Sequence, residues 1–150
     1  MRIQMSNPNI PQLHKFLSTV DKLFPVPLSQ KQNLQDFAIK LSEKANIHCI
    51  MQEDIIVSMV VGYTKNLTDN IAYISVVATL PEYQGKGYAK KLLSEFIEDC
   101  KSKAIKAVHL YTSVINTSAI SMYKNFGFEE WVLSNESRPN DLHLIYTLMR

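Results

Sequence analysis

The chain has 150 residues, the length of one typical domain, and 46% of them are hydrophobic. Its formal net charge is only +2, and its lysines are scattered along the sequence. Proteins that bind nucleic acid usually concentrate basic residues on one face, so nucleic acid is not an expected partner. No apolar run is long enough to cross a bilayer, and the first six residues lack the apolar core of a signal peptide. We therefore expect a single domain over residues 1–150 that is cytoplasmic and has no membrane partner.

The first half of the sequence predicts a short strand, two helices and three strands joined by polar turns. Asn7 or Asn9 can cap the first helix, which carries Pro11 in its first turn. Pro25 and Pro27 end this helix, because proline does not continue a helix interior. The expected elements are, in chain order, a strand over 1–5, a helix from about Ile10, a second helix from Ser29, and strands over 47–51, 55–63 and 71–79.

A sharp turn follows the strand over 71–79. Pro81 ends the apolar run, Gly85 and Gly87 form a tight loop, and an apolar stripe at helical spacing predicts a helix to about residue 103. Such a turn points successive backbone N–H groups into one concavity at the positive end of a helix dipole, and that geometry holds phosphate. Glycine suits the loop because a Cβ would obstruct a close phosphate oxygen or a left-handed backbone angle.

The charges beside this loop favour the same interpretation. Helix starts usually carry Asp or Glu, whose charge complements the positive end of the dipole. Here the first turns carry Lys86, Lys90 and Lys91, and the acidic residues come later in the helix. This order suits a helix whose N-terminus faces a bound polyanion. The alternative is a solvated lysine face after an ordinary turn, since short glycine motifs also occur by chance.

The second half predicts strands separated by one short helix. The expected elements are a strand over 107–111, a helix over 118–125, and strands over 128–133 and 142–148 joined by a polar stretch over 134–141. Strands and helices do not alternate regularly over the whole chain, which argues against a doubly wound nucleotide-binding fold. The expected class is α/β with a mixed, largely antiparallel sheet.

Two segments resemble the signature motifs of the GNAT superfamily of acetyltransferases. The segment 84–89, Gln-Gly-Lys-Gly-Tyr-Ala, is similar to motif A, and 78–83 resembles the usual lead-in to it. The segment 116–128 resembles motif B, in which Asn, Ala, Tyr and a final Gly-Phe recur at this spacing. The resemblance implies the GNAT fold, with helices on both faces of a sheet that splays at the cofactor site. It also implies acetyl-CoA as cosubstrate and an amine acceptor, in a small molecule or a peptide.

The resemblance also implies which residues contact acetyl-CoA. The pyrophosphate would bind the backbone N–H groups of Gln84, Gly85, Lys86, Gly87, Tyr88 and Ala89. The pantetheine arm would pair with the end of the strand over 71–79, where Thr79 adds backbone contacts, and Asn116 would hold it by a side-chain amide. The amide of Val77 would polarise the thioester carbonyl and stabilise the oxyanion. Tyr123 would protonate the departing thiolate.

Two of these residues have simpler alternatives. Tyr123 can be an aromatic residue that packs on the pantetheine or in the core. Asn116 can cap the helix over 118–125, a role that is compatible with cofactor binding.

The sequence does not identify the general base that an attacking amine requires, because no carboxylate lies on the strand over 71–79. The candidates are Glu82 beside the loop, a water relay at Tyr73 or Ser75, and the more distant Glu53, Asp54, Asp69 and His109. The resemblance implies an acceptor site between 23–29 and 134–141. Its candidate lining residues are Phe24, Pro25, Trp131 and Arg138.

No metal site is expected. The histidines at 14, 48, 109 and 143 fall on separate predicted elements, and Cys49 and Cys100 fit buried free thiols. The leading interpretation is therefore an acetyl-CoA-dependent N-acetyltransferase without a metal. A non-catalytic acyl-CoA-binding module, acting as a sensor or docking domain, is the main alternative. An enzyme with an unrelated phosphate ligand is a weaker one, and a homodimer also stays open.

Overall fold

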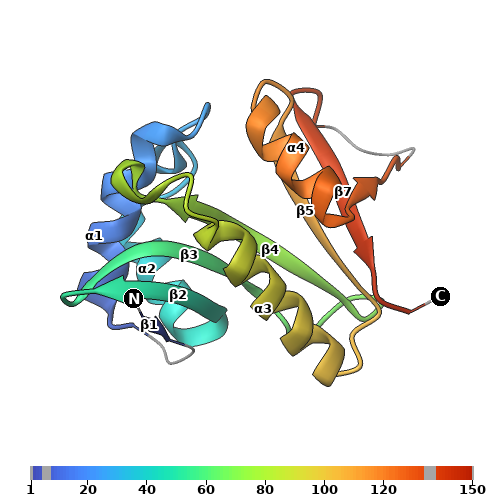
Figure 1. The fold of residues 1–150 in the computed structure, drawn as a ribbon, viewed down its shortest axis with the longest axis horizontal. Helices are drawn as coiled ribbons and strands as arrows, with labels where there is room; N and C mark the ends of the chain where they lie inside the picture. Colours follow the sequence, from blue (N-terminus) through green and yellow to red (C-terminus); the bar gives the residue numbers. More distant parts are fainter. Residues whose placement is uncertain (1, 5–7, 134–137, 150) are drawn as a thin grey trace.

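The structure of the protein is a computed structural model that describes residues 2–4, 8–133 and 138–149 (Figure 1). Short 3₁₀ turns at 21–23, 28–30 and 81–83 join some of its elements. The helices and strands are, in chain order, β1 (Arg2–Gln4), α1 (Ile10–Val20), α2 (Leu34–Lys44), β2 (Asn46–Gln52), β3 (Ile55–Tyr63), β4 (Ile71–Thr79), α3 (Tyr88–Ser102), β5 (Ala107–Ser113), α4 (Thr117–Phe126), β6 (Glu129–Glu130) and β7 (Asp141–Thr147). Residues 1 and 5 of the expected first strand, and 134–137 of the expected polar stretch, lie outside the described residues.

The strands form one sheet in the order β1-β2-β3-β4-β5-β7-β6. Neighbouring strands are antiparallel except β4 and β5, which are parallel. Helices α1 and α2 cover one face of the half that contains β2 and β3, and α3 crosses the other face (Figure 1). Helix α4 lies on the same side as α3, against the half that contains β5 and β7. The expected α/β class, the largely antiparallel sheet and the helices on both faces are confirmed.

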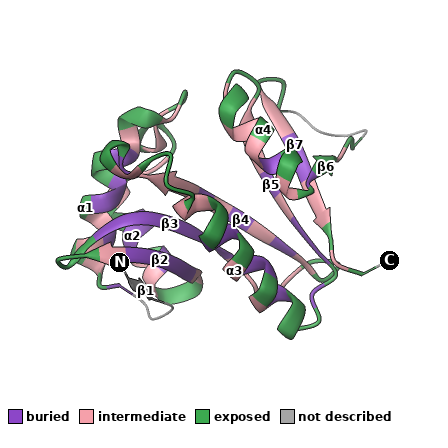
Figure 2. Cartoon of the chain, in the orientation of Figure 1, coloured by how far each residue is buried: buried purple, intermediate pink, exposed green. Residues whose placement is uncertain are grey.

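The main core lies where helices cover both faces of the sheet. β3 is buried over 56–62, and Figure 2 shows this strand as a nearly continuous buried segment. β4 instead alternates, with Ala72, Ile74 and Val76 buried and the residues between them only half-buried. Successive side chains of a strand point to opposite faces. One face of β4 therefore belongs to the core, and the other face, which carries Tyr73, is only partly covered.

The sheet divides between β4 and β5. These strands pair over three residues only, from Ile71 with Ala107 to Tyr73 with His109. Beyond this point β5 continues to pair with β7, and β4 continues to pair with β3. The two halves consequently diverge from Tyr73 and His109 onward, as Figure 1 shows. This is the expected splay.

A β-bulge lies in β4 next to this point. Val61 pairs with Val76 and Gly62 pairs with Ile74, so Ser75 has no directly opposite residue on β3. A bulge of this kind bends its strand and increases the local twist. It thus helps β4 to turn away from β5.

Two expected elements differ from the structure. Helix α2 begins at Leu34 and not at Ser29. Ser29 donates its N–H and its hydroxyl to the Asp21 carboxylate at 2.9 and 2.6 Å, so its side chain is not available as a helix cap. Asn33 caps α2 instead, by accepting the N–H of Asp36. The expected strand over 128–133 is reduced to Glu129–Glu130. Trp131 adds one backbone hydrogen bond to the His143 carbonyl at 2.9 Å, and residues 131–133 are not part of a strand.

Both cysteines are buried, as expected, and neither forms a disulfide with another described residue. Burial raises the pKa of Cys49 to about 11 and that of Cys100 to about 12. Both thiols therefore stay protonated near neutral pH, and a protonated thiol is a poor nucleophile. In the ranges that the structure describes, no helix is long and apolar enough to cross a membrane.

The close contact around Gly62 gives the first prediction. A Cβ at Gly62 would lie 2.2 Å from the carbonyl oxygen of Tyr73 and 2.9 Å from the Phe96 ring. Because the obstructing atom belongs to the backbone beside the bulge, Gly62→Ala should destabilise the protein by about 3 kcal/mol or more, the upper range for overpacking. Urea unfolding followed by circular dichroism measures this change.

The matched control is Gly85→Ala, because no atom lies within 4 Å of a Cβ built at Gly85. Its cost should be limited to the left-handed backbone angle, about 1–2 kcal/mol. Equal destabilisation by the two variants would contradict the close packing described at Gly62.

Candidate active site

A cavity of about 760 Å³ opens where β4 and β5 diverge. Its walls come from β4, the glycine loop, the start of α3, β5, α4 and the segment after α1. Nine of the ten residues predicted from the sequence line this cavity, and Lys86 does not. The nine are Val77, Thr79, Gln84, Gly85, Gly87, Tyr88, Ala89, Asn116 and Tyr123. Segments that are distant in the sequence are thereby brought to one site.

The glycine loop has the backbone conformation that its sequence requires. Gly85 and Gly87 both have φ of 80°, a left-handed angle that favours glycine. Gly87 is the N-cap of α3, and in the described structure no side chain caps this helix. The first N–H groups of an α-helix have no partner within the helix. Here they lie beside the cavity at the positive end of the α3 dipole, an arrangement suited to an anion.

The lysines near the loop are divided between cavity and solvent. Lys90 lines the cavity. The Nζ atom of Lys86 lies 5.7 Å from the centroid of the Tyr83 ring, outside the cavity lining. The first turn of α3 has no acidic residue. The charge around this helix start is thus positive.

The outer part of β4 points backbone groups into the cavity. The N–H of Leu80 donates to the Val57 carbonyl at 2.9 Å, and Ser58 is the residue opposite Thr79. In an antiparallel pair, residues that bond to the partner strand alternate with residues whose N–H and C=O point away. By this alternation Val77 and Thr79 direct their backbone groups away from β3, toward the side that β5 has left.

The side chain of Gln84 connects the loop to this strand. Its Nε2 donates to the carbonyl oxygen of Thr79 at 3.1 Å. The Thr79 hydroxyl lies 2.7 Å from the Ser58 hydroxyl on β3. Gln84 and Thr79 therefore fix the position of the loop relative to β4.

Tyr123 forms the opposite wall. It is 6% exposed, and its ring lies 5.7 Å from that of Phe128, centroid to centroid. Burial raises the pKa of its hydroxyl far above the ordinary value, so the phenol is neutral and can donate a hydrogen bond. Asn116 is the N-cap residue of α4, but its side chain makes no capping hydrogen bond in the described structure. The alternative role as a side-chain cap is therefore not realised.

A cluster of imidazole and aromatic rings, which sequence reasoning missed, lies next to the cavity. It consists of Tyr73, His109, Tyr111, Trp131 and His143. The Nδ1 atom of His109 lies 2.8 Å from the Nε2 atom of His143, at hydrogen-bond distance. The Tyr111 ring is stacked on His143 at 4.1 Å, and the Tyr73 ring lies 5.0 Å from His109.

The sequence carried a partial signal for this cluster. Alternation along β5 predicts that His109 and Tyr111 share a face. The position of His143 depends on the pairing of β5 with β7, in which Tyr111 lies opposite His143. His109 and His143 lie on separate elements, as expected, but the sheet brings their side chains together.

The expected acceptor-lining residues fall into two neighbouring cavities. Phe24, Pro25 and Arg138 line the cavity described above. Trp131 lines a second one, of about 990 Å³, together with His109, and Tyr73 lines both. The Arg138 guanidinium lies 3.9 Å above the Tyr111 ring and 3.5 Å from the Asp141 carboxylate. Burial raises the pKa of Tyr73, and nearby Arg138 offsets part of this shift.

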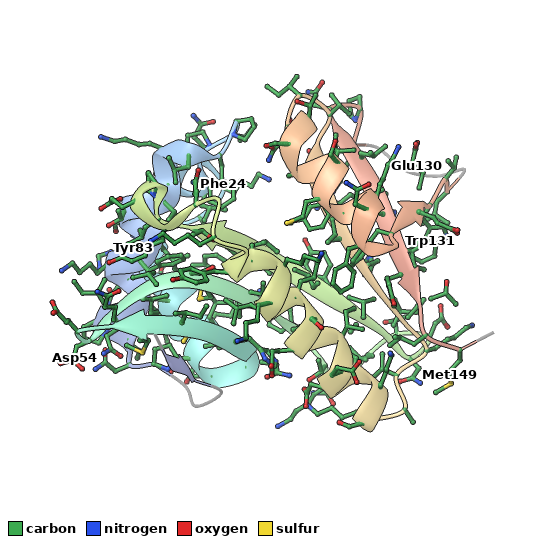
Figure 3. All side chains as sticks on the ribbon, viewed as in Figure 1. Phe24, Asp54, Tyr83, Glu130, Trp131 and Met149 are labelled. Atoms are coloured by element: carbon green, nitrogen blue, oxygen red, sulfur yellow. The ribbon has the colours of Figure 1, made fainter. Side chains whose placement is uncertain are left out.

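The carboxylates considered as bases lie elsewhere. Glu53 and Asp54 form the turn between β2 and β3, and Figure 3 shows Asp54 at the opposite end of the molecule from Trp131. Glu82 is exposed in a 3₁₀ turn, and Asp69 lies in the turn before β4. His109, by contrast, lies directly beside Tyr73. Among the described residues, no group of three or more His, Cys, Asp and Glu side chains gathers as metal ligands.

Comparison with proteins of known sequence gives matches to acetyltransferases. A 61-residue stretch is 41% identical to mycothiol acetyltransferase of Arthrobacter sp. (strain FB24), and it covers 41% of this chain and 19% of that protein. A 56-residue stretch is 36% identical to N-alpha-acetyltransferase 30 of Schizosaccharomyces pombe, covering 37% of each protein. The match thus spans about a fifth of the length of the mycothiol acetyltransferase.

Comparison with solved structures extends the likeness to the whole fold. An acetyltransferase of the GNAT family from Staphylococcus aureus Mu50 has a TM-score of 0.77 at 19% identity, over 98% of this chain and 99% of that one. The PaiA N-acetyltransferase of Thermoplasma acidophilum, in complex with coenzyme A, has a TM-score of 0.74 at 16% identity, over 98% and 99%. At these identities the likeness shows the fold alone.

The family assignment rests on a match to most of the chain. The model of the acetyltransferase (GNAT) family matches residues 13–128, a range that includes the glycine loop, β4, β5 and α4. The chain belongs to the acetyltransferase (GNAT) family.

Proposed function

We propose that this protein is an acetyl-CoA-dependent N-acetyltransferase that transfers the acetyl group to a primary amine by direct attack. The observation that carries this proposal is the cavity between the diverging strands. There the uncapped start of α3, the outward backbone of Val77 and Thr79, and Tyr123 border one space. Membership in the acetyltransferase family supports the same function.

The cofactor would lie along the cavity wall that the glycine loop and β4 form. Its phosphates would accept hydrogen bonds from the backbone N–H groups of 84–89, with the positive charge of Lys86 and Lys90 nearby. Its pantetheine arm would run along β4 beside Val77 and Thr79, where it takes up backbone bonds that β5 does not make. The uncommitted side chain of Asn116 would hold the arm from the α4 side.

The reaction needs two hydrogen-bond donors at the thioester. The amine nitrogen attacks the carbonyl carbon, and the carbonyl oxygen becomes an oxyanion, which the N–H of Val77 stabilises. Collapse of this intermediate breaks the C–S bond, and the electron pair leaves on sulfur. The amine nitrogen releases its proton to solvent water, and water returns a proton to Tyr123 after it has donated. The neutral hydroxyl of Tyr123 then donates toward that sulfur as general acid. The raised pKa of Tyr123 makes hydrogen bonding to the thiolate its main contribution, with the proton delivered late in the step.

The acceptor would enter between the segment after α1 and the start of β7. Apolar residues of 23–28 form one side of this entrance, and the pair of Arg138 and Asp141 forms the other. Matched relatives are named both for mycothiol and for N-alpha-acetylation. The proposed acceptors accordingly include small-molecule amines and peptide amines.

Release of free coenzyme A tests the proposed function. Wild-type protein is incubated with acetyl-CoA and a panel of primary alkylamines, amino sugars, amino acids and short peptides, and thiol release is followed with a thiol-reactive dye. We expect amine-dependent release and an acetylated amine in the mass spectrum. The two buried cysteines should add little background, because their thiols are protonated. Coenzyme A binding without turnover on any amine would favour the acyl-CoA-binding module, and no binding would exclude both.

The second prediction concerns the loop. In Gly87→Val, a bulky side chain would enter the space proposed for phosphate, so coenzyme A affinity measured by calorimetry should fall below detection. No atom of the described structure lies within 4 Å of a Cβ at this position, so a bound ligand is what the side chain would obstruct. The backbone strain at φ of 80° is a separate effect on stability.

Gly127→Val is the control for lost stability, which comes both from positive φ and from the 2.9 Å approach of a Cβ to the Tyr146 ring. Gly127 also has positive φ, but it follows α4 and does not line the cavity. This variant should lose thermal stability and still bind coenzyme A. If folded Gly87→Val keeps wild-type affinity, the phosphate site is elsewhere.

The third prediction concerns Tyr123. Tyr123→Phe removes the hydroxyl and keeps the ring that packs against Phe128. Turnover should fall by about 100-fold or less, the lower range for a lost proton donor, while coenzyme A affinity stays nearly unchanged. Steady-state kinetics over a pH series measures the effect. If Tyr123→Phe keeps wild-type turnover at every pH, Tyr123 is only a packing residue.

A further inference from the structure

Charged side chains line the cavity between the diverging strands unevenly. Among the described residues, its lining contains three cations, Lys31, Lys90 and Arg138, and one acid, Asp141. Lys90 is on the first turn of α3, beside the loop proposed to bind phosphate. Lys31 is on the segment after α1, and Arg138 and Asp141 are at the start of β7, on the opposite side of the space between the two halves of the sheet (Figure 1). The part of the cavity proposed for the acceptor is therefore bordered by two cations and one carboxylate.

The backbone beside Arg138 is fixed to the end of β5. The N–H of Asp141 donates to the Arg138 carbonyl at 3.2 Å and closes a turn, and the N–H of Val114 donates to the Asn140 carbonyl at 3.0 Å. The guanidinium of Arg138 lies 3.9 Å above the Tyr111 ring on β5. Stacking on an aromatic face favours one orientation of a planar guanidinium. Arg138 thus presents its guanidinium at a defined place in the cavity wall.

The ion pair with Asp141 does not use the full binding capacity of Arg138. One guanidinium nitrogen lies 3.5 Å from one carboxylate oxygen, which is long for a charge-assisted hydrogen bond. The Arg138 side chain is 46% exposed, and an exposed ion pair adds little stability. Burial raises the pKa of Tyr73, Arg138 offsets part of this rise and Asp141 adds to it, so both charges lie near the Tyr73 side chain. A guanidinium carries five N–H donors in a planar fork that matches a carboxylate or a phosphate, so Arg138 has the capacity to bind a second anion.

We infer that the acceptor amine also carries a carboxylate or phosphate group, and that Arg138 binds this group while the amine attacks the thioester. This inference rests on the proposed acetyl transfer. The fork of Arg138 donates two parallel hydrogen bonds to the oxyanion, while one face of the guanidinium stays on the Tyr111 ring. Lys31, across the space, adds positive charge on the other side of the acceptor. A diamine would instead place a second cation near Arg138 and Lys31, and juxtaposed like charges are unfavourable.

A matched series of acceptors tests this inference. The amines 4-aminobutanoate, 4-aminobutanamide and 1,4-diaminobutane share one chain and carry a negative, a neutral and a positive end group. Shorter and longer homologues are included, and the comparison is made at the chain length with the highest kcat/KM. For the wild type, kcat/KM should be about 10-fold or more higher for the carboxylate than for the amide, the range for a hydrogen bond to a charged group, and lowest for the diamine. A second arm compares 3-aminopropyl phosphate with 3-aminopropanol, and the arm with the larger ratio identifies the preferred oxyanion.

Variants of Arg138 test whether this residue causes the preference. Arg138→Gln should lower the ratio of kcat/KM between the carboxylate and the amide toward one. The same two amines are compared in every variant, so effects on folding, on coenzyme A binding and on intrinsic amine reactivity cancel in this ratio. Arg138→Lys keeps the charge but loses the planar fork, and it should retain only part of the preference.

Lys124→Gln is the matched control for the loss of a surface cation. Lys124 is also 46% exposed and pairs with a carboxylate, that of Glu130 at 3.0 Å, but it does not line the cavity. Its variant should keep the wild-type ratio. Circular dichroism shows that each variant is folded.

Asp141→Asn separates acceptor binding from a merely structural ion pair. If Arg138 binds the oxyanion, then Asp141 competes for the same guanidinium, and removing its charge should raise the ratio between the carboxylate and the amide. If the ion pair only stabilises the turn, Arg138→Gln and Asp141→Asn remove the same contact. Equal changes of the ratio in these two variants would therefore overturn the inference.

Distinct outcomes separate this inference from the proposed function. If the wild type acetylates the neutral amines as well as the carboxylate and the phosphate, the inference is wrong and the proposed function stands. A preference that Lys31→Gln removes and Arg138→Gln retains would also overturn it, because the anion would then bind on the other side of the space. If the wild type binds coenzyme A but acetylates neither these amines nor the wider panel, the proposed function and this inference fall together.

Discussion

The short parallel pairing between β4 and β5 is the constraint on which the rest of the structure depends. It ends after three residue pairs, although both strands continue for several residues. Ending it leaves the backbone groups of Val77 and Thr79 without strand partners on that side. The Thr79 carbonyl accepts a hydrogen bond from the Gln84 side chain. Because buried backbone groups without partners are costly, the remaining groups must face water or a ligand. The sheet thus gives up part of its hydrogen-bond ladder, and the same loss creates a cavity lined by main-chain donors and acceptors.

Each half of the sheet has its own support, which allows the two to diverge. The half with β2, β3 and β4 lies between helices on both faces, and its central strand is almost wholly buried. The other half is supported by α4 through aromatic contacts, among them Phe126 with Tyr146 at 5.6 Å. The bulge at Ser75 bends β4, and the absence of a side chain at Gly62 leaves room for the neighbouring backbone. Packing within each half therefore stabilises the sheet in place of the strand pairing that is missing between β4 and β5.

Backbone and side chains divide the proposed chemistry between them. The loop and the outer part of β4 offer N–H groups, and the backbone conformation alone positions these donors. Proton transfer needs a side chain in a defined position, and the proposed acid, Tyr123, lies on α4. Alternation along β5 places His109 on the face opposite Val108 and Leu110, which are buried.

The sequence by itself determined the features that depend on neighbouring residues. Glycines at 85 and 87, the strand before them and the apolar stripe after them specify a turn with left-handed angles at the start of a helix, and the structure has these angles. The order of the expected strands and helices also predicted the class of fold. The sequence misplaced the start of α2. Serine often caps helices, but Ser29 donates its hydroxyl to the Asp21 carboxylate instead. Only the tertiary structure decided the imidazole cluster. His109 and His143 are separated by 34 residues, and no local pattern encodes their contact. The contact arises because β5 pairs with β7 in one register, and that register is set by the burial of whole strands.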